Sequence, residues 1–557
     1  MLGIAEFGGG LLDGLVLVLL SLVVASVPWG LVVLRATRCE RGDPVVVRAA
    51  SLLERSALGL ALCQAGLLAV KLLLLRSYLG SDALALFGAT AQARAAVARL
   101  LLALVLAVAA RRLRARTDDP SRWAFVGATV LAILVAGAWL THATSRLEDR
   151  GWLMALTVAH QAATGAWVGG VLHLALLWRR GRADASTAEA ASFAGAVDSF
   201  SRVALPAVAL SIATGVPLAA AYLGSWQALV GSGPGSLLLG KLALVGLALC
   251  LGGSTFLAAR RASRPSPARR AGGRDAAFVS VEALLLVGAL FAAASLASQP
   301  PAVDTVETQA TLAEVATTFA PKWPTLHTPS VATKRAAATD PLAVVGWQRS
   351  STEYSWSNFS HNVAGLVVLP MAVCMLLAPR ARWARHWPLG LVVLAAFVFL
   401  RSCASDGIWP LGTLSPFASD SEGFQHRLAA GLALALGLVE WRARTADRPD
   451  RRAWVFPMLA AAGGILLVTH AHTAFEGKAS YLVQVTHVAM GVLALVLAAA
   501  RLLELRVAGP LGRLGGTIAG TAMLLIAFVL MFYREANVVV SDAPLPDTIT
   551  TAPAVRR

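Results

Sequence analysis

The chain has 557 residues, a formal net charge of +17, an apolar fraction of 57% and only 14% charged residues. Its mean hydropathy of +0.67 is far above that of an ordinary soluble domain, which excludes a soluble globular protein. The apolar residues form runs of about 20 rather than alternating segments of about 10, so the sequence predicts membrane-spanning helices and excludes a membrane β-barrel.

The sequence predicts an all-α fold, a polytopic transmembrane bundle of about fourteen helices. The first run lacks a basic segment before it and is followed by arginines, so we expect a retained helix rather than a secretion signal. In chain order the helices are expected at 11–34, 54–75, 92–110, 123–141, 152–178, 200–222, 236–259, 277–297, 361–378, 387–403, 424–441, 453–470, 481–503 and 514–533.

The positive charge predicts an orientation in the membrane and not a nucleic-acid partner. Lys and Arg are concentrated in alternate connections, whereas the short connections between them hold only Arg76, Arg146, Arg150 and Lys478. Because basic connections face the cytoplasm, both termini are expected outside. The basic connections are 35–55, 111–122, 179–199, 260–275, 379–387, 441–453 and 501–513.

The hydrophilic stretches divide the predicted bundle into two parts. Residues 1–297 form an eight-helix half, and residues 361–533 form a six-helix half. Residues 298–360 form a long extracytoplasmic segment, which carries Trp and Tyr residues of the kind found at membrane interfaces. Residues 534–557 form an extracytoplasmic tail. The Arg-rich linker at 260–274 is expected to meet anionic lipid of the bilayer.

The sequence lacks the motifs of several enzyme classes. It contains no GxxxxGK[ST], which makes direct use of ATP improbable, and no HExxH zinc-protease motif. It contains no CxxCH either, which excludes covalent c-type haem. The protein is therefore expected not to be an enzyme.

Most of the ten histidines fall near predicted outer helix ends. A lone membrane histidine is most often a buried, hydrogen-bonded side chain, but so many on one rim favour a metal site, because neutral imidazole binds copper, zinc and iron. Met490 follows His487 by three residues and shares its helix face, and its thioether favours Cu(I). The candidate metal ligands are His142, His160, His361, His426, His470, His472, His487 and Met490.

The segment THAHTAF at 469–475 suggests how several of these histidines could share one ion. His470 and His472 would flank an ion if the backbone is extended there, and His487 lies about two turns into the next helix. His361 and His426 would complete a cluster if their helices are neighbours. Sequence alone leaves open whether there is one cluster or several sites.

A second pattern concerns glycine. In HQAATG, HNVAG, HRLAAG and HVAMG a histidine is followed four or five residues later by glycine, at Gly165, Gly365, Gly431 and Gly491. A residue one turn below the histidine lies on nearly the same face, so the pattern predicts close approach of a neighbouring helix at each glycine.

At these residues the sequence resembles the copper resistance protein D (CopD) family of bacterial inner membranes. In the second half the likeness runs through HNVAG, RHWPL, FLRS, WPLG, FQHRLA, GGILLVTHAH and a final YRE. In the first half it rests on HQAATGAWVGG, DSFSRVALPAVALSIATG and LLLGKLALVGLAL, with a CopD-like segment at about 193–297. The family's usual Tyr-Gly pair is replaced by GPGSLLLGK, a departure that concerns the connection near Pro234.

The resemblance implies copper handling at the inner membrane, often beside a periplasmic copper carrier of the CopC type. For a pathway the best candidate is the helix at 152–178, where His160 lies high and His173 low with Trp167 between them. Arg202, Lys241 and Glu282 fit the family motif, and a structural or gating role is expected for them. An ion pair between Arg202 and Glu282 is also expected, because both lie toward the cytoplasm.

The leading hypothesis is therefore copper transport or delivery, with uptake favoured by an inside-negative potential at about 2.3 kcal/mol per charge per 100 mV. Copper could be bound as Cu(I) or Cu(II). The first alternative is a haem b-containing electron carrier with histidine axial ligands. The second is a catalyst with an outer metal site, which paired carboxylates or HExxH would have favoured.

Overall fold

The structure is a computed structural model in which residues 2–34, 44–177, 187–261, 273–338, 350–414, 421–446, 452–469 and 477–535 are described. These residues are almost entirely helical, and they contain no β-strand beyond an isolated bridge between Ile408 and Leu414. The predicted all-α fold is confirmed.

A long helix occurs at each of the predicted runs. In the first half these are α1 (Leu2–Pro28), α3 (Pro44–Leu79), α5 (Ala91–Ala115), α6 (Pro120–Ala138), α7 (Arg150–Leu177), α8 (Thr187–Leu223), α10 (Gly233–Arg261) and α12 (Gly273–Ser298). In the second half they are α16 (Ser351–Leu377), α17 (Leu389–Asp406), α18 (Ser421–Thr445), α19 (Val455–Thr469), α20 (Lys478–Arg506) and α21 (Pro510–Met531). The π-helical turn Trp29–Val33 extends α1.

Eleven helices of the described part are long and apolar enough to cross a membrane, so the chain is a multi-pass membrane protein. Three helices at predicted spans, α7, α18 and α19, are not among the eleven. With 15 residues, α19 covers only about 22 Å along its axis. The number of spans and the orientation stay predictions.

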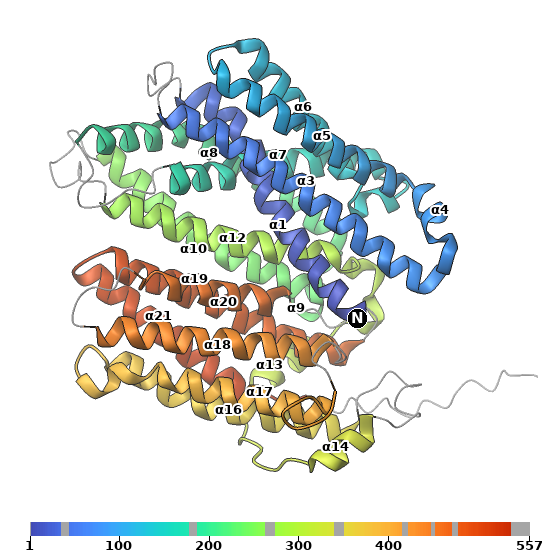
Figure 1. Cartoon of the computed structure of the whole chain (residues 1–557), viewed down its shortest axis with the longest axis vertical. Helices are drawn as coiled ribbons and strands as arrows, with labels where there is room; N and C mark the ends of the chain where they lie inside the picture. Colours follow the sequence, from blue (N-terminus) through green and yellow to red (C-terminus); the bar gives the residue numbers. More distant parts are fainter. Residues whose placement is uncertain are drawn as a thin grey trace, which may run out of the picture.

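The two halves pack against each other along α10 and α12, which lie between the N-terminal helices and the C-terminal helices (Figure 1). On one side α12 contacts α1 and α7, and on the other it contacts α19 and α20. One hydrophobic core includes buried residues of both halves, such as Leu286 of α12 and Leu495 of α20. A second core is formed by α1, α3, α5 and α6.

The segment 299–338 lies at one end of the bundle, which we refer to as the loop end and which is on the right in Figure 1. It contains the short helices α13 (Leu312–Phe319) and α14 (Val331–Ala338). Thr311 and Glu314 form a capping box that starts α13, and the Glu314 carboxylate also binds Lys478 Nζ at 2.9 Å. This ion pair ties α13 to the first residue of α20.

At the opposite end, four charged side chains join α18 to α20. Glu440 is fully buried, and its Oε1 binds Arg444 Nε at 2.5 Å and Arg501 Nη2 at 2.9 Å. Arg501 Nη1 also binds Glu504 Oε2 at 2.7 Å. Two acids and two guanidinium groups balance, as buried charges require.

The glycine pattern holds at three of its four positions. A Cβ at Gly165 would come within 2.8 Å of Val24, and one at Gly491 within 2.7 Å of Val468. At Gly365 a Cβ would collide with the backbone of Met531 and Ala527, so α16 and α21 touch there through backbone atoms. Gly431 has open space around it, and at that position the prediction is wrong.

We expect Gly365→Ala to lower the stability of the protein, because the new methyl group would push α21 away from α16. Overpacking of this kind costs about 1–3 kcal/mol. The matched control is Gly431→Ala, the same change in the same sequence pattern but in open space. Thermal unfolding in detergent should show a clear fall for the first variant and little change for the second, and equal midpoints would contradict the close contact.

The tie between Glu314 and Lys478 gives a pH-dependent prediction. Hydrogen bonds from Thr311 and Lys478 lower the pKa of Glu314 from 4.5 to about 2. The contribution of the ionised Glu314 carboxylate to the stability of the folded protein is therefore fully present above pH 4.5 and is lost as the pH falls toward 2.

The midpoint of thermal unfolding should be compared for the wild type and Glu314→Gln. We expect a difference that is constant between pH 7 and 5 and that shrinks below pH 4.5. A difference that stays the same down to pH 3 would show that the carboxylate charge is not its source.

Candidate metal site at the loop end

Two of the predicted ligands, His361 of α16 and His487 of α20, meet in the structure. Their ring centroids are 5.7 Å apart, and the rings are nearly perpendicular at 86°. His361 lies ten residues after Ser351 and His487 nine after Lys478, so both lie about 14 Å along helices that begin at the loop end. The two imidazoles therefore lie side by side at similar depth in the bundle.

Three histidines are held in the same way by their own helices. In each, Nδ1 lies within hydrogen-bonding distance of the carbonyl oxygen four residues earlier. The pairs are His361 with Ser357 at 2.9 Å, His426 with Glu422 at 2.8 Å and His487 with Val483 at 2.9 Å. A carbonyl only accepts, so Nδ1 carries the proton and Nε2 carries the lone pair that a metal ion needs.

Tyr533, just beyond α21, forms one wall of the site. Its ring stacks on His361 with a centroid distance of 4.0 Å and lies edge-on to His487 at 6.1 Å. The Tyr533 side chain is almost fully buried, and its hydroxyl donates to Glu535 Oε1 at 2.8 Å. The same carboxylate oxygen accepts a hydrogen bond from Ser357 Oγ. These contacts add a phenol and a carboxylate to the surroundings of His361.

The buried amide of Asn362 fixes the chain that carries Tyr533. Asn362 Nδ2 donates to the carbonyl oxygens of Leu530 at 3.1 Å and Tyr533 at 3.0 Å. Its Oδ1 accepts from the backbone of Thr325 at 2.6 Å and from Arg534. All of the hydrogen-bonding capacity of this side chain is thus used to hold the end of α21 and the outer segment against α16.

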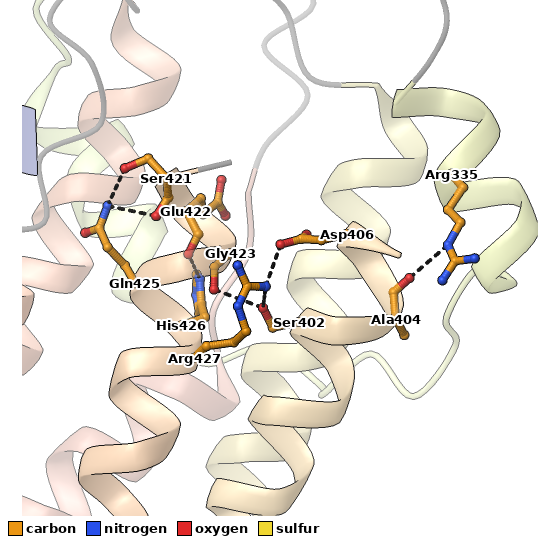
Figure 2. A network of polar contacts seen from close by, with 10 residues as sticks. All are labelled: Arg335, Ser402, Ala404, Asp406, Ser421, Glu422, Gly423, Gln425, His426 and Arg427. Carbon is orange, nitrogen blue, oxygen red and sulfur yellow. Dashed lines mark hydrogen bonds and ion pairs between the residues drawn. The ribbon is translucent and has the colours of Figure 1, made fainter. Parts of the chain in front are cut away.

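Figure 2 shows His426 in the second turn of α18, beside Glu422 and Arg427. Both His426 and Glu422 contribute to the electrostatic surroundings of His361. The start of α18 is fixed to α17 by Arg427, whose Nη1 binds Asp406 at 2.7 Å and Ser402 at 2.9 Å.

The described part of the structure does not place the other predicted ligands against the pair of His361 and His487. His470 and His472 lie outside the described residues. Met490 is buried in α20. In the described ranges, no three His, Cys, Asp or Glu side chains are arranged as a metal site. The structure therefore brings two of the predicted ligands together, and their role as ligands and the single cluster of five histidines stay predictions.

The two candidates of the first half lie in separate hydrogen-bonded positions. His142 Nε2 lies 3.0 Å from the carbonyl oxygen of Ala297 at the end of α12. His160 Nδ1 lies 3.1 Å from the Ser211 carbonyl and 3.1 Å from Thr214 Oγ1, both on α8. Each histidine is bound by backbone or hydroxyl groups of a neighbouring element.

The predicted pathway residues of α7 are tightly packed. His173 is fully buried, with Nε2 3.2 Å from Ser26 Oγ and Nδ1 2.7 Å from the Gly169 carbonyl. Trp167 is buried as well, and the backbone at Gly169 touches that of Ser21 in α1. In this conformation both nitrogens of His173 are engaged, and its role in a pathway stays a prediction.

The three charged residues of the predicted gating group lie apart. Arg202 pairs with Asp198, four residues earlier, at 3.2 Å, so the predicted ion pair with Glu282 is wrong for this conformation. The buried carboxyl group of Glu282 lies beside Gly252 of α10. Lys241, near the start of α10, contributes to the electrostatic surroundings of His160. Any gating role for these residues stays a prediction.

Sequence reasoning missed the residues that surround His361. Tyr533 and Glu535 belong to the YRE that was noted only as a motif, and Asn362 belongs to HNVAG. The signal was a polar motif directly after an apolar helix, at the same predicted end as the histidines. Its meaning depends on α21 lying beside α16, which no local pattern reveals.

We expect Asn362→Leu to destabilise the protein, because the carbonyl groups of Leu530 and Tyr533 would each lose one of their donors and the Thr325 N–H would lose its acceptor. Each hydrogen bond lost in this way costs about 0.5–1.5 kcal/mol. The control is Gln227→Leu, an amide-to-leucine change at an exposed position. The midpoint of thermal unfolding should fall for the first variant and stay for the second. An unchanged midpoint in Asn362→Leu would contradict the role assigned to this amide.

Comparison with known families gives one match. The family model described as copper resistance protein D matches residues 194–296, from α8 through α12. The match confirms the resemblance found from motifs for this segment, which is similar to the copper resistance protein D family. Arg202, Lys241 and Glu282 lie inside the matched residues, whereas His361 and His487 lie outside them. No curated protein and no solved structure matches the chain.

Proposed function

We propose that this protein, part of which matches the copper resistance protein D family, binds copper between His361 and His487 and delivers it into or across the membrane. The observation that carries the proposal is the contact of these two imidazoles, 5.7 Å apart, at the same depth of two different helices. The match of residues 194–296 to the copper resistance protein D family supports copper as the ion.

The chemistry of the pair suits a transition metal. Both rings have Nδ1 held by a backbone carbonyl, so each offers Nε2 as the ligand atom. Bonds from metal to imidazole nitrogen are about 2 Å, and a small rotation of either ring would bring both nitrogens onto one ion. Further candidate ligands in this proposal are His426, His470 and His472, and the thioether of Met490 is one more.

The haem alternative predicts two histidines on opposite sides of a flat ring with apolar walls. His361 and His487 instead touch edge to face, and Tyr533 stacks on one of them, which leaves no room for a porphyrin between them. This geometry argues against haem b at this pair.

The proposal extends to the surroundings of the protein. We place it in the bacterial cytoplasmic membrane with the loop end outside, where a periplasmic carrier of the CopC type would hand over copper. Uptake is the proposed direction, because an inside-negative potential attracts the cation. The proposed site binds and passes on the ion and performs no catalysis.

The test measures copper bound to the detergent-purified full-length protein by elemental analysis and by competition with a chelator. We expect His361→Ala and His487→Ala each to lower copper affinity at least tenfold. Removing an outer partner of a ligand typically lowers affinity tenfold to hundredfold, so a loss above that range indicates a direct ligand. The matched control is His327→Ala, an exposed histidine of the outer segment.

A double variant of His470 and His472 shows whether that segment adds ligands. Copper accumulation by cells that express the same variants tests the direction. Iron with a Soret band in the wild type, or copper binding unaffected by loss of both His361 and His487, would overturn the proposal.

A further inference from the structure

The carboxylate of Glu535 is connected to His361 through a short chain of hydrogen bonds. Ser357 Oγ donates to Glu535 Oε1 and lies 3.3 Å from Nδ1 of His361. Because the Ser357 proton goes to the carboxylate, its hydroxyl oxygen is left to share the imidazole N–H, whose shorter hydrogen bond is to the Ser357 carbonyl oxygen at 2.9 Å. The order of the chain is carboxylate, serine hydroxyl, imidazole.

A second contact of Glu535 fixes the other wall of the site. Tyr533 donates its hydroxyl proton to the same carboxylate oxygen at 2.8 Å while its ring stacks on His361. The backbone N–H of Glu535 donates to Asn358 Oδ1 at 2.8 Å, which holds the residue on α16. Glu535 and Tyr533 are 7% and 2% exposed, so this arrangement is built into the interior.

Partners of this kind are common beside metal-binding histidines. A carboxylate that receives the second N–H of an imidazole fixes the tautomer and makes the other nitrogen a better ligand. Here the Ser357 carbonyl fixes the tautomer of His361, and the Ser357 hydroxyl links the same N–H to the carboxylate over one more bond. The carboxylate also places negative charge near the point where His361 and His487 meet.

That charge distinguishes between the two oxidation states of copper. The attraction of a carboxylate for Cu(II) is twice that for Cu(I) at the same distance, because the energy scales with the product of the charges. The side chains that contact His361 offer nitrogen and oxygen atoms, which suit Cu(II), whereas Cu(I) prefers sulfur.

We propose that Glu535 is a positioning residue that makes the His361–His487 site selective for Cu(II) over Cu(I). This inference rests on the proposed function, because it assumes that copper binds at the histidine pair. Glu535 acts through Ser357 and through its charge and is not itself assigned as a ligand.

The experiment measures Cu(II) affinity and, under anaerobic reducing conditions, Cu(I) affinity of the full-length protein in detergent by chelator competition. We expect Glu535→Gln to lower Cu(II) affinity by about 10- to 100-fold and Cu(I) affinity by less than about threefold. Glu535→Asp, which keeps the charge, should keep the preference for Cu(II). Glu307→Gln is the matched control, since Glu307 is an exposed glutamate of the outer segment.

Ser357→Ala gives a second route if Glu535→Gln does not fold. It removes the link to His361 but keeps the carboxylate, and it should also lower Cu(II) affinity more than Cu(I) affinity. Where both variants fold, the double variant should lose less Cu(II)-binding free energy than the sum of the losses in the two single variants, because both residues act on one chain of contacts.

The outcomes separate this inference from the proposed function. Equal losses for both ions, or no loss in Glu535→Gln and Ser357→Ala while His361→Ala still abolishes binding, would overturn the role of Glu535 alone. Copper binding that is insensitive to His361→Ala and His487→Ala would instead overturn the proposed function and this inference with it.

Discussion

The loop-end site depends on the amide of Asn362. Where the end of a helix is buried, its last carbonyl groups have no water to bind and need a donor from the protein. Asn362 supplies two donors to the end of α21, and this fixes the direction in which the chain leaves the helix. Tyr533 then reaches the face of His361, and Glu535 reaches Ser357. One buried polar side chain thus sets the positions of an aromatic wall and of a carboxylate.

Much of the fold could be predicted from the sequence, because a helix that crosses lipid needs a long apolar run and few other structures satisfy its backbone there. The depth of the histidines followed from the same runs. His361 and His487 were expected near the same end of the bundle, and they do lie at similar depths. The glycines at 165, 365 and 491 also signalled close helix contacts, because small residues permit them.

The remainder of the site depends on which helices are neighbours, and depth alone carries no such information. Arg202 and Glu282 were expected at the same end, yet Arg202 binds Asp198 on its own helix, where a partner four residues away is always within reach. Gly431 follows its histidine as the other glycines do, but in the described part of the chain no atom lies within 4 Å of where its Cβ would be. Tyr533 and Glu535 join the site only because α21 returns alongside α16.

The charged group at the opposite end restricts how the second half can move. Glu440 is shared between Arg444 of its own helix and Arg501 of α20, and Arg501 also holds Glu504. Parting α18 from α20 there would break the Arg501–Glu440 pair and the longer Arg444–Glu504 pair, while Glu440 would keep Arg444 and Arg501 would keep Glu504 on their own helices. The charges thus tie the two helices at that end, and each helix also carries a partner that would neutralise its buried charge if they moved apart.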